Sequence, residues 1–126
     1  MAGKIIADQI EHSTAGSLDT SYVVNGSAKA YANFSATAIV KSLNYSSFVD
    51  NGVGDHTLTV VSALNDINYT YGGFSRATGT TAFDRGCTPD GVDPTTTQQS
   101  YHSCQLWTAT LEDMEANFTV IHGDLA

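Results

Sequence analysis

The chain has 126 residues, a length that suits one domain with a single core and excludes a large enzyme with a separate cofactor domain. Only 14% of its residues are charged, and the formal net charge of −8 disfavours binding to a phosphate backbone, so no nucleic-acid partner is expected. No apolar run reaches the roughly eighteen residues that a membrane-spanning helix needs, so no membrane partner is expected either.

Residues 1–20 are expected to form an N-terminal arm. Ile6 and Ile10 lie at helical spacing with Ile5 beside them, and the small polar residues 13–17 would end such a helix early. Burial of each isoleucine would contribute about 1.5–3 kcal/mol, so these three are candidate contacts with a neighbouring subunit. The arm could equally dock on its own domain. Asp8 and Gln9 interrupt the apolar stretch, so no signal peptide is expected.

From residue 22 onward the pattern favours strands. Residues 22–24 form a short apolar run that ends at an Asn-Gly turn pair. Residues 28–34 alternate, with Ala30, Ala32 and Phe34 on one face. Residues 38–45 are expected to form a strand with a bulge.

A hairpin is the clearest local signal. Residues 46–49 and 56–61 flank a glycine-containing turn, with Leu58 and Val60 on one face of the second arm. Residues 67–71, 101–107 and 117–122 are expected to be further strands, and residues 76–100 a long loop that carries a contact. About seven to eight short strands indicate an all-β fold, an antiparallel sandwich or barrel-like domain over residues 21–126.

No set of residues indicates catalysis or a cofactor. His102 and Ser103 are adjacent on a predicted strand, so their side chains point to opposite faces and cannot form a nucleophile–base pair. His102, Cys104 and the distant Cys87 lack the spacing of a zinc site, so no metal is expected. Cys87 and Cys104 could form a disulfide worth about 3 kcal/mol, or remain thiols in a reducing compartment.

The aromatic residues allow two interpretations. Tyr69, Tyr71 and Tyr101 could present rings to a glycan, because aromatic faces stack on sugars. Alternatively they form the core of a small β domain, which needs large apolar side chains, and Trp107 is expected to belong to that core.

Four segments together resemble a known family. These are TSYVVNGSAKAYANF at residues 20–34, GKIIADQI at 3–10, VDNGVGDHTLTV at 49–60 and VIHGDLA at 120–126. As a set they resemble small virion structural proteins, described as capsid-surface or tail-fibre-like, of marine and freshwater tailed bacteriophages. The chain departs from that pattern by Tyr31, where a tryptophan is common, and by residues 82–94.

This resemblance implies a non-enzymatic, trimeric, all-β protein located in the virion and assembled in the host cytoplasm. The expected function is a capsid decoration (cement) or head-fibre protein whose partners are its own copies and the major capsid protein or other virion proteins. The alternative is a tail-fibre or tail-tip component that binds host surface glycans. A small glycan-active or metal-dependent enzyme is a third interpretation, from a different class.

Overall fold

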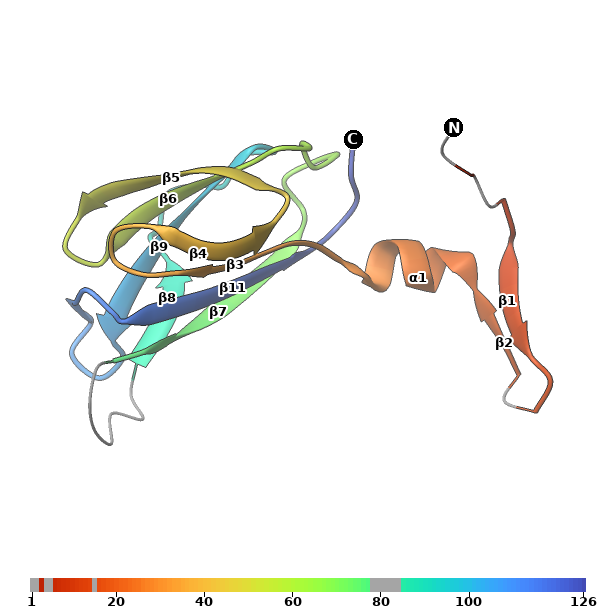
Figure 1. The fold of residues 1–126 in the computed structure, drawn as a ribbon, viewed down its shortest axis with the longest axis horizontal. Helices are drawn as coiled ribbons and strands as arrows, with labels where there is room; N and C mark the ends of the chain where they lie inside the picture. The colour runs from red at the N-terminus through yellow and green to blue at the C-terminus, as the bar shows by residue number, and fades with distance from the viewer. Residues whose placement is uncertain (1–2, 4–5, 15, 78–84) are drawn as a thin grey trace.

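The computed structural model describes residues 3, 6–14, 16–77 and 85–126. It consists of a projecting N-terminal arm and a β-sandwich body (Figure 1). The arm contains β1 (Gln9–His12), β2 (Gly16–Asp19) and α1 (Thr20–Gly26). The body contains β3 (Ala28–Phe34), β4 (Ile39–Leu43), β5 (Tyr45–Gly52), β6 (Asp55–Val60), β7 (Thr70–Arg76), β8 (Arg85–Pro89), β9 (Gln98–Gln105), β10 (Thr110–Leu111) and β11 (Ala116–His122).

The body is made of two antiparallel sheets. Sheet I has the strand order β4-β3-β11-β7, and sheet II has the order β10-β9-β6-β5 with β8 paired to β9. The all-β, sandwich-like architecture predicted from the sequence is therefore confirmed. The body has more strands than predicted. Strands β8 and β10 contain polar residues and show no alternation of apolar residues, so the sequence pattern does not predict them.

The core lies between the two sheets. Phe34, Leu58, Tyr101 and Ile121 are fully buried there, and aromatic rings contact one another across the interface. The predicted alternation in residues 28–34 is confirmed, because Ala30, Ala32 and Phe34 face this core. The hairpin of β5 and β6 is confirmed as well, with Leu58 and Val60 on its buried face.

Gly54 fixes the tip of that hairpin. Its φ of +65° lies in the left-handed region, which favours glycine. A Cβ at this position would lie 2.5 Å from the carbonyl oxygen of Ser103 in the neighbouring strand β9. The Gly54 carbonyl accepts a hydrogen bond from the Ser103 amide, so the turn requires both the torsion and the close approach that only glycine permits.

Three local expectations are wrong. The Tyr-Val-Val run predicted as a strand lies in α1, because the Asp19 side chain caps the helix by accepting a 2.7 Å hydrogen bond from the Ser21 amide. The short helix expected around Ile10 is instead strand β1, paired with β2. The long loop expected at 76–100 contains strand β8. Because α1 extends the arm to Gly26, the body begins at Ala28 rather than at residue 21.

Candidate functional site

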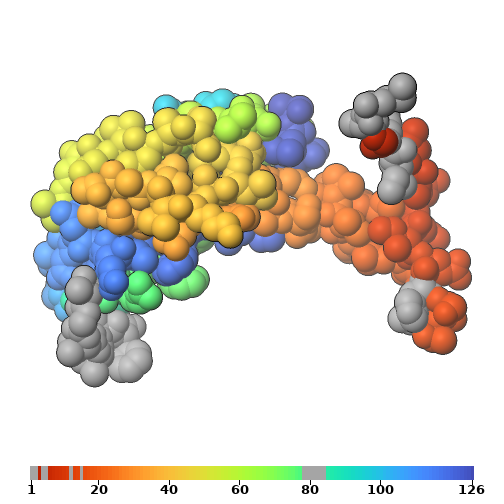
Figure 2. Space-filling view, in the orientation of Figure 1, coloured from red at the N-terminus to blue at the C-terminus, as the bar shows by residue number. Residues whose placement is uncertain are grey.

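The arm projects from the body instead of folding back on it. Figure 2 shows the β1–β2 hairpin at the far end of the molecule, joined to the sandwich through α1. None of the residues of α1 is buried, and every described side chain of β2 is exposed. The described residues of the arm therefore contribute nothing to the core of the body.

Apolar side chains on the arm face solvent. Ile6 is 82% exposed and Ile10 is 52% exposed, while Ile5, the third isoleucine of the predicted contact, lies outside the described residues. Ile10 pairs directly with Leu18 across the hairpin, so these two side chains share one face. Helix α1 adds Tyr22 and Val24, both exposed. An isolated hairpin and a helix of two turns are marginal alone, so the arm would gain most of its stability from a partner.

Specific hydrogen bonds hold the arm in this direction. The Thr20 amide and hydroxyl both donate to the carbonyl of Asp8, at 2.9 Å and 3.0 Å, which ties α1 to the start of the hairpin. At the other end of α1, the ammonium group of Lys29 donates to Val24 O and to Ser27 Oγ. Nδ1 of His122, in β11, donates to the Gly26 carbonyl at 3.0 Å. The junction with the body is thus bonded from two strands of sheet I.

The arm is also acidic. Its described residues include Asp8, Glu11 and Asp19. The hydrogen bond from the Ser21 backbone lowers the pKa of Asp19, because it stabilises the charged carboxylate that caps the helix. A partner surface for the arm would therefore combine apolar area with basic or neutral polar groups.

The outer face of sheet I is a second exposed apolar surface. Register pairing aligns Leu43, Tyr31, Val120 and Gly72 in one row across the four strands. The next row contains Lys41, Asn33, Phe118 and Phe74. We call this surface the outer patch, defined by its large apolar residues Tyr31, Leu43, Phe74, Phe118 and Val120.

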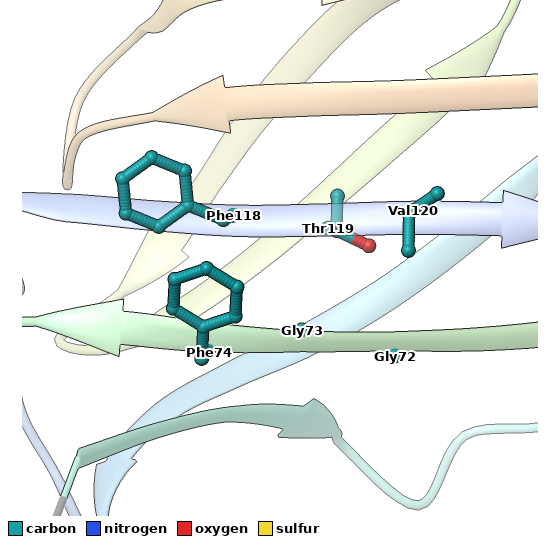
Figure 3. A pocket seen from close by; sticks show the side chains of 6 residues that line it. All are labelled: Gly72, Gly73, Phe74, Phe118, Thr119 and Val120. Atoms are coloured by element: carbon teal, nitrogen blue, oxygen red, sulfur yellow. The ribbon is translucent and has the colours of Figure 1, made fainter. Parts of the chain in front are cut away.

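A hollow of about 190 Å³ lies within the outer patch. Figure 3 shows the rings of Phe74 and Phe118 side by side, from β7 and β11, with their centroids 4.9 Å apart. Gly72 leaves open space next to Val120, because a Cβ at Gly72 would meet no atom within 4 Å. Phe74 is 63% exposed. Exposed apolar area of this kind on a sheet face is typical of a protein–protein contact.

The tyrosines proposed to face a glycan lie largely in the core. Tyr101 is completely buried and Tyr69 is 8% exposed, so neither ring can stack on a sugar, and Tyr71 packs against both of them. The Tyr69 hydroxyl donates to Thr95 O at 2.9 Å and accepts from Gln99 Nε2 at 3.0 Å. The core interpretation of Tyr69 and Tyr101 is supported. The core prediction for Trp107 is wrong, because this side chain is 88% exposed.

The two cysteines are buried free thiols. Cys87 pairs in register with Ser103, and Cys104 pairs with Gly86, so the cysteine side chains point to opposite faces of sheet II. The two cysteines therefore cannot form the disulfide considered from the sequence unless one of the two strands turns its opposite face outward. Burial raises the pKa of Cys87 to about 12, which makes its thiol unreactive.

The core contains a histidine–serine pair that no sequence pattern predicts, because His56 and Ser103 lie 47 residues apart. Ser103 lies 3.3 Å from Nε2 of His56, on the strand beside it, and the Ser103 hydroxyl donates to the Glu112 carbonyl at 2.7 Å. Both residues are fully buried, and His56 is stacked on Phe48. Burial lowers the pKa of His56, so the ring is neutral at pH 7. Without solvent access this pair supports the packing of the core and has no route to a substrate.

The acidic connection between β10 and β11 has structural partners. Glu112 forms a 3.0 Å ion pair with Arg85, and Glu115 forms a 3.2 Å ion pair with Arg76. Asp113 accepts a 2.8 Å hydrogen bond from the Gly54 amide. These carboxylates therefore fasten the connection to strands of both sheets.

Comparisons with known proteins add no family to this picture. No family model, curated protein or solved structure matches the chain. Among the described residues, no helix has both the length and the apolar character needed to cross a membrane.

Proposed function

We propose that this protein is a non-enzymatic bacteriophage virion structural protein that decorates the capsid surface as a homotrimeric cement or head-fibre protein. The arm attaches each chain to the major capsid protein or another virion protein, and the sandwich body lies on the outside of the shell. Added buried area between shell subunits raises the free energy needed to separate them.

The observation that carries the proposal is the exposed arm. Its apolar residues Ile6, Ile10, Tyr22 and Val24 are exposed, and no described residue of the arm belongs to the core of the body. Hydrogen bonds from Lys29 and His122 direct the segment away from the body, which suits an element that reaches a neighbouring molecule. The phage assignment itself rests on the resemblance of the four sequence segments.

The outer patch supports self-association. It lies on sheet I, away from the tip of the arm, so one chain can contact a shell through its arm and another copy through this sheet face. Where the outer patch meets a different surface of the next copy, the contact is heterologous, and it closes into a ring when the rotation between copies allows closure. A ring of three copies agrees with the trimer that the resemblance implies.

The alternative is a tail-fibre or tail-tip component that binds host glycans. One observation favours it. Trp107 lies in the turn between β9 and β10 with its side chain 88% exposed, next to the exposed Leu106. An exposed indole provides the flat apolar face on which sugar rings stack.

The test is binding of purified protein to virions that lack it. Wild-type protein should sediment with the particles, and the arm variant Ile10→Asp/Val24→Asp should remain in the supernatant. Val61→Asp is the matched control, because Val61 is a similarly exposed valine on the body. Equal binding by the arm variant and the control would overturn the proposed role of the arm. A glycan array with wild type and Trp107→Ala tests the alternative.

A further inference from the structure

Three side chains gather on the outer face of sheet II, away from both the arm and the outer patch. Asp55 begins β6, Asp90 follows the end of β8, and His102 lies in β9. Their potential ligand atoms, one from each residue, all lie within 4.8 Å of one another. From these residues we infer a binding site for a divalent transition-metal ion such as Zn²⁺, independent of the proposed function.

Strand register places two of the three ligands. Asp55 of β6 and Thr88 of β8 lie directly opposite His102, one on each side of β9. Neighbouring Tyr101 points into the core, so His102 and its partners point to the other face of the sheet. All three ligand residues are half-buried, which shields a bound ion from bulk water on one side while leaving it a path of entry.

Hydrogen bonds position both carboxylates. Oδ1 of Asp90 accepts a 2.7 Å hydrogen bond from the Val92 amide, and the Asp90 amide donates to Ser100 O, which brings the loop over β9. Oδ1 of Asp55 accepts from Asn51 Nδ2 at 3.3 Å. Each carboxylate is thereby oriented before an ion arrives, as in metal sites whose ligands are held by surrounding hydrogen bonds.

The donor set selects the class of ion. Two carboxylate oxygens and one imidazole nitrogen suit Zn²⁺ and similar ions, whereas Ca²⁺ and Mg²⁺ prefer oxygen ligands alone. Two carboxylates also balance the charge of a divalent ion beside a neutral imidazole. Ligands around a four-coordinate Zn²⁺ lie about 3.4 Å apart, so the three side chains need to approach one another by at most about 1.4 Å.

A bound ion would fasten three segments that are distant in the chain. It would join the start of β6, the middle of β9 and the loop that follows β8. No metal site is expected from the sequence, because the spacing around the cysteines does not fit one. The ligands found here come from separate segments, so no motif spacing indicates them.

The test uses tag-free, full-length protein freed of metal with a chelator. Isothermal titration with Zn²⁺ should show one ion bound per chain, and excess Mg²⁺ or Ca²⁺ should not displace it. Asp90→Asn and His102→Gln should each weaken binding by more than about tenfold. The matched control is Asp93→Asn, because Asp93 is an exposed carboxylate in the same loop outside the cluster, and it should bind as wild type does.

Co²⁺ titration separates this site from binding to the thiols. Ligation by oxygen and nitrogen gives only weak d–d bands, whereas a cysteine ligand adds an intense thiolate-to-cobalt band. Circular dichroism checks that each variant is folded. If His102→Gln does not fold, Asp90→Asn still tests the site, because it alters a loop outside the core. No saturable binding, equal binding by Asp90→Asn and wild type, a thiolate band, or displacement by Mg²⁺ or Ca²⁺ would each overturn the inference.

Discussion

The hydroxyl of Thr119 in sheet I donates a 2.7 Å hydrogen bond to the phenolic oxygen of Tyr101 in sheet II. Both groups are buried, so this bond joins the two sheets through the middle of the core. Burial also raises the pKa of Tyr101, which keeps the phenol neutral. The sandwich is therefore held together by a polar contact as well as by apolar packing.

Removal of that bond should destabilise the body. Tyr101→Phe removes the oxygen that accepts the Thr119 hydroxyl in the middle of the core, and the expected loss is about 1–3 kcal/mol of unfolding free energy. Urea denaturation measures it. Tyr31→Phe is the control, since the Tyr31 ring lies on the outer patch, and its stability should stay within about 0.5 kcal/mol of wild type. Equal stability of the two variants would contradict the role of the bond.

His56 should make the fold sensitive to mild acid. Its pKa is lowered in the folded state by burial, although the carboxylates of Asp50, Asp113 and Asp55 oppose the shift. Below the ordinary histidine pKa of 6.5 the unfolded chain binds a proton that the folded chain does not, so stability falls as the pH drops through that value. Unfolding free energies measured between pH 7.5 and about pH 5 should show this decline.

A phenylalanine at this position tests the assignment. His56→Phe removes the titrating group while keeping an aromatic ring beside Phe34 and Phe48. The slope of stability against pH between about pH 5 and 7 should become flatter than in wild type, whatever the absolute stability of the variant. An unchanged slope would show that other groups cause the acid sensitivity.

Gly54 should be far less tolerant of substitution than Gly91. Both have positive φ values, +65° and +86°, so alanine costs about 1–2 kcal/mol of backbone strain at either position. Only at Gly54 would the added Cβ also collide with backbone atoms, whereas at Gly91 it would meet nothing within 4 Å. Gly54→Ala should therefore lose at least about 1 kcal/mol more than Gly91→Ala in denaturant unfolding. Similar losses would contradict the proposed close packing of the turn.

The thiols should be inaccessible in the native protein. Cys87 and Cys104 are both buried, and the pKa of Cys87 is raised to about 12. Native protein should react slowly with a thiol reagent such as iodoacetamide, and denatured protein should react at both cysteines. Reducing agent should leave the thermal midpoint unchanged. A fall in that midpoint on reduction would indicate a disulfide instead.

The sequence predicts most reliably where a local pattern and burial agree. Alternating apolar residues predict the buried faces of β3 and β6, because a strand inside a sandwich needs that period. The pattern fails where another interaction dominates. Tyr22–Val24 have strand propensity, yet the Asp19 cap and the hydrogen bonds of Thr20 favour a helix.

Residue type alone does not give the location of a side chain. Tryptophan is a residue type expected in a core. Trp107, however, follows the end of β9 in a turn, and its side chain is exposed. Tyr69 and Tyr101 are amphipathic, and the partners of their hydroxyl groups come from distant segments. The same holds for Asp55, Asp90 and His102, since strand register brings Asp55 beside His102 and a hydrogen bond to Ser100 brings Asp90 over them.

The most direct test of the central claim is the number of copies of this chain in purified virions, measured by quantitative mass spectrometry against the major capsid protein. A decoration protein is present in hundreds of copies, in a fixed ratio to the capsid subunit, and this is the predicted result. Tens of copies would favour the tail-fibre alternative and contradict capsid decoration. Absence from the particles would contradict a virion role altogether.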